Sequence, residues 1–476
     1  MPVDVDPSDL LAARWTMALS LGSHIVLSCL GVALPLVIYL AHRRGLRHDD
    51  PDALALARRL GKAAGVLFAV GAVSGTILSF EMGVLWPGLM DRFGAVIGLP
   101  FALEGIFFFL EAIFIGVYLY GWDRLPARVH LATLIPITLA GVGGTLCIMA
   151  VNGWMNHPHG FDIEHYLTTG EVTGVDPWAA MFNPALRTEF LHMLSAAYVV
   201  AAFLTAAVYA NGWRKGRRDG LHRLGVRIPL TIASIAVPLQ VLTGDMAIRY
   251  IAAEQPTKMA AAELVTETGG NQPLTLGGLL VDGEVKGAIE VPDALSLLLH
   301  FDRAGVVQGL DAVPADERPP VNVVHLSFEV MVGLGTAMLL LAVVVGWRGW
   351  RRRRRGIPDE PEGWEHPWVV RGVIAAAPAS ILALEAGWTT TEVGRQPWIA
   401  RGVMRVSESV TPNDGIPWVL LALIAIYLGM GTSAVLILRG MSRRWRQGQE
   451  VHAPYEPVPP PDEAGAATSV PEESPV

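Results

Sequence analysis

The sequence predicts an all-α integral membrane protein with nine transmembrane helices, and three observations lead to this fold class. First, 52% of the 476 residues are hydrophobic and only 17% are charged, whereas an ordinary soluble domain has about 25% charged residues. Second, the apolar residues form stretches of about 20 residues or more, which is the length at which a helix crosses the hydrocarbon core. Third, basic residues are concentrated in alternate connections between these stretches.

The nine apolar stretches are expected to be helices, because a segment inside the bilayer must satisfy its own backbone hydrogen bonds. The first is not a cleavable signal peptide, since its flank, Met1 to Leu10, is acidic and the apolar run is too long. We expect the spans to form one membrane domain, residues 1–446. The spans lie near residues 13–41, 62–85, 99–121, 129–151, 190–212, 227–248, 323–347, 369–391 and 416–438.

Basic residues predict the orientation of the chain. They are frequent after spans one, five, seven and nine, whereas Arg92 alone lies between spans two and three. Connections rich in Lys and Arg stay in the cytoplasm, so the N-terminus is expected outside and the C-terminus in the cytoplasm. The basic residues are Arg43, Arg44, Arg47, Arg58 and Arg59; Arg214, Lys215, Arg217, Arg218 and Arg223; Arg351 to Arg355; and Arg439, Arg443, Arg444 and Arg446.

Two segments lie outside the spans. The longest connection, 249–322, is on the outer side in this topology, and connections of this length are usually functional or disordered. Its first part, 249–263, is expected to be ordered and to end in a short helix. The tail, 447–476, is rich in Pro, Glu, Ser and Ala, which is typical of a disordered segment.

Composition excludes several functions. The net charge is −8, whereas a nucleic-acid-binding protein needs a basic face, so no nucleic-acid partner is expected. Cys29 and Cys147 are the two cysteines, too few for a disulfide scaffold or for a zinc or iron–sulfur site built on cysteine.

Polar residues inside the spans are the candidates for function, because an ionisable group in the bilayer is costly. Glu104 and Glu111 are seven residues apart in span three, which brings them to nearly one face of the helix. The candidates are His24 in span one, Glu104 and Glu111, His192 near the start of span five, Met331 about two turns into span seven, and Glu392 at the end of span eight.

Three chemistries fit these residue types, and their spacing alone does not decide among them. His and Met are common axial ligands of haem. A pair of buried carboxylates suits proton conduction or ion-coupled transport. In the predicted topology the candidates lie in the outer half of the membrane or near its middle. That depth favours redox centres that receive electrons from a donor at the outer surface.

Several short motifs occur in a distinctive order along the chain. Together they resemble subunit I of the cytochrome bd quinol oxidases, from about residue 10 to about residue 440. The first motif and the short outer loop are most similar to the cyanide-insensitive branch of that family. The motifs are Ser79-Phe80-Glu81-Met82-Gly83, Leu103-Glu104-Gly105 through Glu111, Gly121-Trp122-Asp123-Arg124-Leu125, Asn152-Gly153-Trp154-Met155, Phe190-Leu191-His192, Gln255-Pro256-Thr257-Lys258-Met259-Ala260 and Gly394-Arg395-Gln396-Pro397-Trp398.

The resemblance implies a terminal oxidase that oxidises membrane quinol at the outer face and reduces O₂ to water. It implies that His192 and Met331 ligate a low-spin haem b, which leaves no open position on the iron. His24 would ligate haem d, or a further haem b in its place, where O₂ binds. Glu392 would ligate a high-spin haem b.

The remaining expected sites also follow from the resemblance. Trp388 would lie between haems and assist electron transfer. Lys258 and Glu263 match the quinol-site pair of the family, and Arg395 would pair with haem propionates, because a guanidinium suits carboxylates. Glu104 and Glu111 would form a proton path from the cytoplasm, so that the enzyme generates a membrane potential without pumping protons.

The resemblance further implies a multi-pass protein of the bacterial inner membrane, in contact with lipid, that forms a heterodimer with subunit II and has a possible small accessory subunit. Glu329 departs from the family, because some members have a basic residue there. Two alternatives are an ion-coupled transporter that uses Glu104 and Glu111, and a haem-bearing membrane anchor that uses only His192 and Met331.

Overall fold

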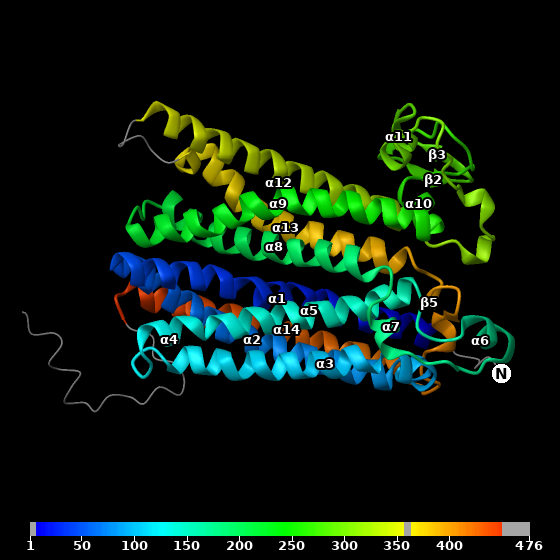
Figure 1. The fold of residues 1–476 in the computed structure, drawn as a ribbon, viewed down its shortest axis with the longest axis horizontal. Coiled ribbons are helices and arrows are strands. Elements are labelled where there is room, and N and C mark those ends of the chain that lie inside the picture. The colour runs from blue at the N-terminus through cyan, green and yellow to red at the C-terminus, as the bar shows by residue number, and fades with distance from the viewer. Residues whose placement is uncertain (1–5, 357–362, 450–476) are drawn as a thin grey trace, which may run out of the picture.

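The computed structural model describes residues 6–356 and 363–449. In these residues, nine helical segments are long and apolar enough to cross a membrane, and they pack side by side as one bundle (Figure 1). The nine predicted spans are therefore confirmed. The segments are α1 (Pro7–His48), α2 (Pro51–Val84), α3 (Pro87–Tyr120), α4 (Ala127–Ala132) with α5 (Leu134–Asn156), α8 (Leu186–Arg214), α9 (Gly220–Glu254), α12 (Val321–Arg355), α13 (Pro367–Val393) and α14 (Ile416–Arg446). Residues 450–476 of the predicted tail lie outside the described residues.

The helices extend beyond the apolar stretches that predicted them. The side chain of Asp6 caps α1 by accepting a hydrogen bond from the Ser8 amide over 2.7 Å, and the helix continues to His48 at its other end. Hydropathy marks the part of a helix that lies in hydrocarbon, whereas the helix itself ends where its backbone is capped. The fourth span is divided into α4 and α5 at Thr133.

α1 is the central helix of the bundle. It packs against α2, α5, α8 and α14, and half of its most apolar window is buried inside the protein. Leu34 of α1, Phe203 of α8 and Leu230 of α9 belong to one large buried cluster. His24 therefore lies on α1, the helix that contacts the largest number of other spans.

The long outer connection folds into a small lobe. α10 (Pro256–Ala262) confirms the predicted short helix. Two antiparallel pairs follow, which sequence analysis did not predict because strands of three residues show no alternation. The pairs are β1 (Leu274–Leu276) with β4 (Ile289–Val291) and β2 (Leu279–Val281) with β3 (Glu284–Lys286), before α11 (Ala294–His300), η1 (Leu310–Ala312) and η2 (Ala315–Glu317).

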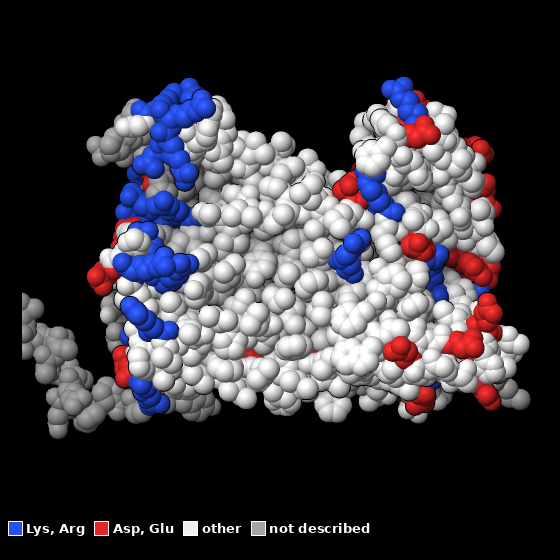
Figure 2. Space-filling view, viewed as in Figure 1, with Lys and Arg blue, Asp and Glu red and all other residues white. Residues whose placement is uncertain are grey.

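Shorter elements complete the same end of the bundle as this lobe (Figure 1). They are α6 (Ile163–Thr169), α7 (Pro177–Met181), β5 (Trp398–Ala400), β6 (Met404–Arg405) and η4 (Val406–Glu408); η3 (Gly363–Glu365) precedes α13. Figure 2 shows Lys and Arg gathered at the opposite end, most of the acidic side chains at the lobe end, and an almost uncharged band between them.

Candidate functional site

His24 is held by a serine on the neighbouring helix. Its Nδ1 atom lies 2.8 Å from Oγ of Ser74 on α2, and that hydroxyl donates to the Gly71 carbonyl over 2.9 Å. The hydroxyl proton is thus used, so Ser74 accepts a hydrogen bond from Nδ1–H and the lone pair of the imidazole is on Nε2. A Cβ atom at Gly75 would lie 3.1 Å from Cε1 of His24, so the glycine makes room for the ring.

Glu81 of α2 contacts α1 one turn before His24. It accepts a hydrogen bond from Ser20, four residues before His24, and is 5% exposed. Glu81 belongs to the Ser79–Gly83 motif, but sequence analysis assigned it no role. The α1–α2 interface therefore carries two polar pairs on the same face of α1.

His192 and Met331 each face a glycine of an adjacent helix. A Cβ atom at Gly244 of α9 would lie 3.3 Å from Cε1 of His192, and one at Gly387 of α13 would lie 2.7 Å from Sδ of Met331. Their helices α8 and α12 both pack against α9 and α13. Nε2 of His192 lies 3.0 Å from the amide nitrogen of Gln240. Both candidate ligands thus point among these four helices.

Trp388 connects the helix of Glu392 with the helix of His24. A Cβ atom at Gly22 of α1 would lie 3.8 Å from the Trp388 ring, and Gly22 is two residues before His24. Trp388 is also one turn before Glu392 on α13. The indole therefore lies where the two helices meet.

Glu392 has two polar partners at the end of α13. Asn152 of α5 donates from Nδ2 to Oε1 of Glu392 over 2.6 Å, and Arg395 donates from Nη2 to Oε2. Arg395 is 5% exposed, and among the described residues its Nε and Nη1 atoms are buried without a hydrogen-bond partner. These two nitrogens are free to bind an anionic group.

The same polar cluster continues to Lys258. Asn156, which is fully buried, accepts a hydrogen bond from Nζ of Lys258 over 2.9 Å. Its Nδ2 donates to Oε1 of Glu189 over 3.0 Å and to Oδ1 of Asn152 over 3.2 Å. A continuous chain of side chains therefore joins Lys258 to Glu392.

Lys258 and Glu263 occupy the two ends of α10, and both are nearly completely buried. Burial, together with the charge of Arg395, lowers the pKa of Lys258, whereas Glu189 acts in the opposite direction. Burial and then the charge of Glu329 raise the pKa of Glu263 to about 8. The pair can therefore exchange protons near neutral pH, as catalytic acids and bases do.

Glu329 lies near this pair. It accepts a hydrogen bond from the amide of Gly277 in the outer lobe over 3.3 Å, and its charge acts on Glu263. The residue that departs from the family therefore belongs to the surroundings of the predicted quinol site, two positions before Met331.

Glu104 and Glu111 have different surroundings, although they lie on one helix. Glu104 is half-buried on α3. Glu111 faces α1, where a Cβ atom at Gly31 would lie 3.4 Å from its Oε1 atom. The two carboxylates are close enough for their charges to interact.

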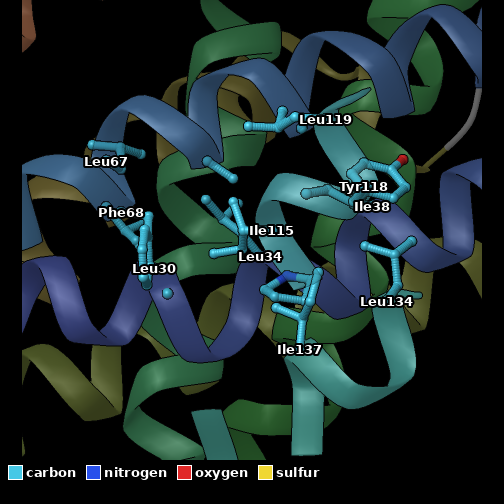
Figure 3. Close-up of a pocket in the computed structure, with 14 residues that line it drawn as sticks. Leu30, Leu34, Ile38, Leu67, Phe68, Ile115, Tyr118, Leu119, Leu134 and Ile137 are labelled. Carbon is cyan, nitrogen blue, oxygen red and sulfur yellow. The ribbon is translucent and has the colours of Figure 1, made fainter. Parts of the chain in front are cut away.

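An internal cavity of about 20 Å³ lies beside Glu111 (Figure 3). Gly31 and the Tyr118 ring both line it, and the Tyr118 hydroxyl lies 3.3 Å from Nδ1 of His42. This volume accommodates about one water molecule. The remaining lining is apolar, with Leu30, Leu34, Ile38, Leu67, Phe68, Ile115, Leu119, Leu134 and Ile137 labelled in Figure 3.

The structure brings together Lys258, Glu392 and Arg395 in one buried cluster, and it joins His24 to Glu392 through the packing of Trp388. Sequence analysis missed Ser74, Asn156 and Glu189, and it named Asn152 only as part of a motif, without a role. The signal for the two asparagines was their spacing of four residues at the end of an apolar stretch, which puts them on one helix face.

The residues present fit haem. The lone pair on Nε2 of His24 is suited to iron, His and Met are common axial ligands of haem, and the two buried nitrogens of Arg395 without a partner among the described residues suit propionates. Among the described residues, no cluster of three His, Cys, Asp or Glu side chains forms a separate metal site.

Comparisons with known proteins identify the family of this chain. The sequence profile described as "Cytochrome bd terminal oxidase subunit I" matches residues 12–446. The chain is 34% identical to the putative cytochrome bd menaquinol oxidase subunit I of Bacillus subtilis over 90% of this chain and 96% of that protein. It is 30% identical to the cytochrome bd ubiquinol oxidase subunit 1 of the same organism over 95% and 96%. The bd oxidase structure from Geobacillus thermodenitrificans matches with a TM-score of 0.84 and 38% identity, over 92% of this chain and 98% of that chain.

Proposed function

Because this chain belongs to the cytochrome bd terminal oxidase subunit I family, we propose on that premise a role for each residue of the site. The protein is a haem-containing quinol:O₂ oxidoreductase of the respiratory chain. It is a multi-pass protein of the bacterial inner membrane and works with subunit II.

Quinol oxidation is assigned to the lobe end of the bundle. Lys258 and Glu263 orient the quinol and accept its protons, which is supported by their burial and by the pKa of about 8 for Glu263. His192 and Met331 would hold the low-spin haem b. The pair of ligands leaves no vacant position on the iron and so suits electron transfer.

O₂ reduction is assigned to the α1–α13 contact. His24 would hold haem d, or a haem b in its place, and Glu392 would hold the high-spin haem b. When bound, the haems carry electrons from quinol to O₂. Ser74 fixes the ring of His24, Arg395 holds Glu392 and binds propionates with its free nitrogens, and Trp388 lies between the two ligand helices.

Protons for water formation come from the cytoplasm through Glu111 and Glu104. The cavity between Tyr118 and Gly31 supports this direction, because it lies beside Glu111. In the proposed orientation the N-terminus is outside, which the concentration of basic side chains opposite the lobe supports (Figure 2). Electrons and protons that reach O₂ from opposite sides generate a membrane potential without pumping.

The exposed face of α2, α3 and α14 is proposed as the contact with subunit II. α2 packs against both of the other helices, and only 6% of its most apolar window is buried. Glu104 lies in the middle of α3 and is only half-buried, whereas a carboxylate at this depth avoids lipid. Lipid covers the remaining apolar faces, and any small accessory subunit would bind there.

The observation that carries the assignment is the arrangement of His24, whose Nε2 lone pair is left free by the bond to Ser74. The test is a reduced-minus-oxidised spectrum with pyridine haemochrome analysis, followed by quinol-driven O₂ uptake in wild type and in His24→Ala. Haem b with the red band of haem d, and loss of uptake in the variant, are expected. Uptake that persists at normal expression contradicts the role of His24.

The same spectra and uptake measurements distinguish the oxidase from an ion-coupled transporter and from a haem-bearing membrane anchor. Haem b alone would keep the oxidase and assign haem b to His24. A folded complex without haem would favour an ion-coupled transporter, and haem without O₂ uptake would favour a membrane anchor. Membership of the cyanide-insensitive branch is tested by titrating O₂ uptake with cyanide.

A further inference from the structure

Four helix ends meet at Asn156. It is the last residue of α5, and its side chain contacts Lys258 of α10 and Glu189 in the first turn of α8. Through Asn152, one turn earlier, the cluster reaches Glu392 at the end of α13. Sequence separations of 33 and 102 residues lie between Asn156 and its partners on α8 and α10, so the fold, not local sequence, creates this junction.

Only a side chain that both accepts and donates fits this position. The carbonyl oxygen of Asn156 faces the Lys258 amine, while its amide nitrogen faces the Glu189 carboxylate and Asn152. A carboxylate at 156 would oppose Glu189, and an apolar group would leave both partners unsatisfied in a buried place. The amide therefore joins groups of opposite charge without bringing them into one ion pair.

Glu189 is suited to act as the counter-charge. It lies in the first turn of α8, where a helix favours a negative group. Its Oε2 atom is buried and, among the described residues, has no hydrogen-bond partner. The Oε2 atom of Glu189 can therefore accept a further hydrogen bond. Only the Asn156 side chain separates the Glu189 carboxylate from the Lys258 amine.

We propose that Asn156 and Glu189 are positioning residues of the quinol site, which hold the Lys258 amine between the ends of α5 and α8 and link it through Asn152 to Glu392. This inference rests on the proposed quinol site at Lys258. It adds a physical connection between the place where quinol is oxidised and the carboxylate assigned to the high-spin haem. Asn156 contacts both Lys258 and Asn152, and so acts on the quinol site and on Glu392. Glu189 acts only on the quinol site.

Two substitutions separate these roles. Asn156→Leu keeps the size of the side chain and removes every hydrogen bond, so the KM for decylubiquinol should rise about tenfold or more, with kcat at saturating quinol nearly unchanged. The absorption of the high-spin haem should also shift, because Asn152 loses its partner. Glu189→Gln keeps an oxygen that accepts from Asn156 and removes only the charge, so the high-spin haem spectrum should stay that of wild type.

The pH profile reports the charge of Glu189. The groups that act on Lys258 are Arg395, Glu189, Glu392 and Arg401, in that order of effect, and the two carboxylates raise the pKa of Lys258. Removal of the Glu189 charge lowers that pKa further. The limb of kcat/KM that belongs to Lys258 should therefore move to lower pH in Glu189→Gln.

Matched controls are available in the same region. Asn183→Leu removes an equally buried amide whose bonds go only to backbone, and Glu164→Gln removes an exposed charge on α6. Binding of decylubiquinone to the anaerobic enzyme, measured by calorimetry, gives a readout without turnover. Haem content shows whether each variant assembles. If Asn156→Leu does not assemble, the isosteric Glu189→Gln still tests the proposal.

Lys258→Ala distinguishes a failure of the proposed quinol site from a failure of the positioning role of Asn156 and Glu189. If it leaves the KM for quinol unchanged, the proposed quinol site is wrong. If it raises KM while Asn156→Leu and Glu189→Gln behave like their controls in affinity and pH profile, the quinol site stands and the positioning role is overturned. The result we expect is that all three variants weaken quinol binding and that only Asn156→Leu also shifts the haem spectrum.

Discussion

Ser74 on α2 accepts a hydrogen bond from Nδ1 of His24 on α1, at a distance of 2.8 Å. A histidine that ligates a metal is usually oriented in this way by a partner on its other nitrogen. The serine also donates to Gly71, so its acceptor role toward His24 is fixed by the helix that carries it.

Ser74→Ala should therefore weaken the haem at His24. Loss of such a partner typically costs about 10- to 100-fold in affinity or activity, because the ring can then turn and change tautomer. The measurement is the carbon monoxide difference spectrum of the reduced complex together with haem content. Ser79→Ala is the matched control, since this serine is exposed on the same helix and bonds only to the Gly75 carbonyl. Equal haem occupancy in both variants would show that Ser74 has no orienting role.

Gly387→Ala should weaken the ligation of the low-spin haem by Met331 and change the redox potential of this haem. A Cβ atom there would lie 2.7 Å from Sδ of Met331, and such overpacking costs about 1–3 kcal/mol. A free methionine can move aside, whereas one bound to iron cannot, so the cost falls on ligation. Redox titration followed at the low-spin haem b absorption measures the effect. Gly333→Ala, where nothing lies near the added atom, should leave the potential unchanged, and a wild-type potential in both variants would contradict the prediction.

The pH dependence of quinol oxidation should include a limb near pH 8 that belongs to Glu263. Its pKa is raised, so the carboxyl is protonated below that pH and accepts a quinol proton only above it. We expect kcat/KM to rise as pH increases through this value and the limb to vanish in Glu263→Gln. Quinol-driven O₂ uptake across a pH range centred on about 8 is the measurement. A limb that persists in the variant would assign it to another group.

The orientation of the bundle can be tested with cysteine labelling. Cys29 and Cys147 are both buried, so the background is low. Glu284→Cys, in the outer lobe, should react with a membrane-impermeant maleimide in intact spheroplasts, and Arg353→Cys, in the last turn of α12, should react only after permeabilisation. The reverse pattern would invert the proposed topology and with it the direction of proton uptake.

The spans could be predicted from the sequence because hydrophobic length and the distribution of Arg and Lys are local properties. α10 was predicted for the same reason, from its short run of helix-forming residues. The hairpins β1–β4 and β2–β3 were not, since strands of three residues contain too few positions to alternate. The helices are longer than the predicted apolar stretches, because capping residues such as Asp6 lie outside the hydrophobic stretch.

The haem ligands were candidates because of their place in the spans, but the roles of the haem and quinol residues were predicted only through the resemblance. The residues that hydrogen-bond to them were given no role. His24 and Ser74 are 50 residues apart, and Asn152 and Glu392 are 240 apart. Serine and asparagine within helices are commonplace, and nothing local distinguishes one that bonds to its own backbone from one that holds a functional group. Such pairs are visible only when the helices are packed together.

The half-buried carboxylate of Glu104 has a consequence for how the cell handles this protein. A copy that inserts without its partner would present a polar group to lipid in the middle of α3, at a cost of about 2.5–3.5 kcal/mol if it is charged. Synthesis of the two subunits in equal amounts would keep that surface covered. A surplus of this chain would remain marked by one misplaced side chain, which membrane proteases could use to recognise an unassembled subunit.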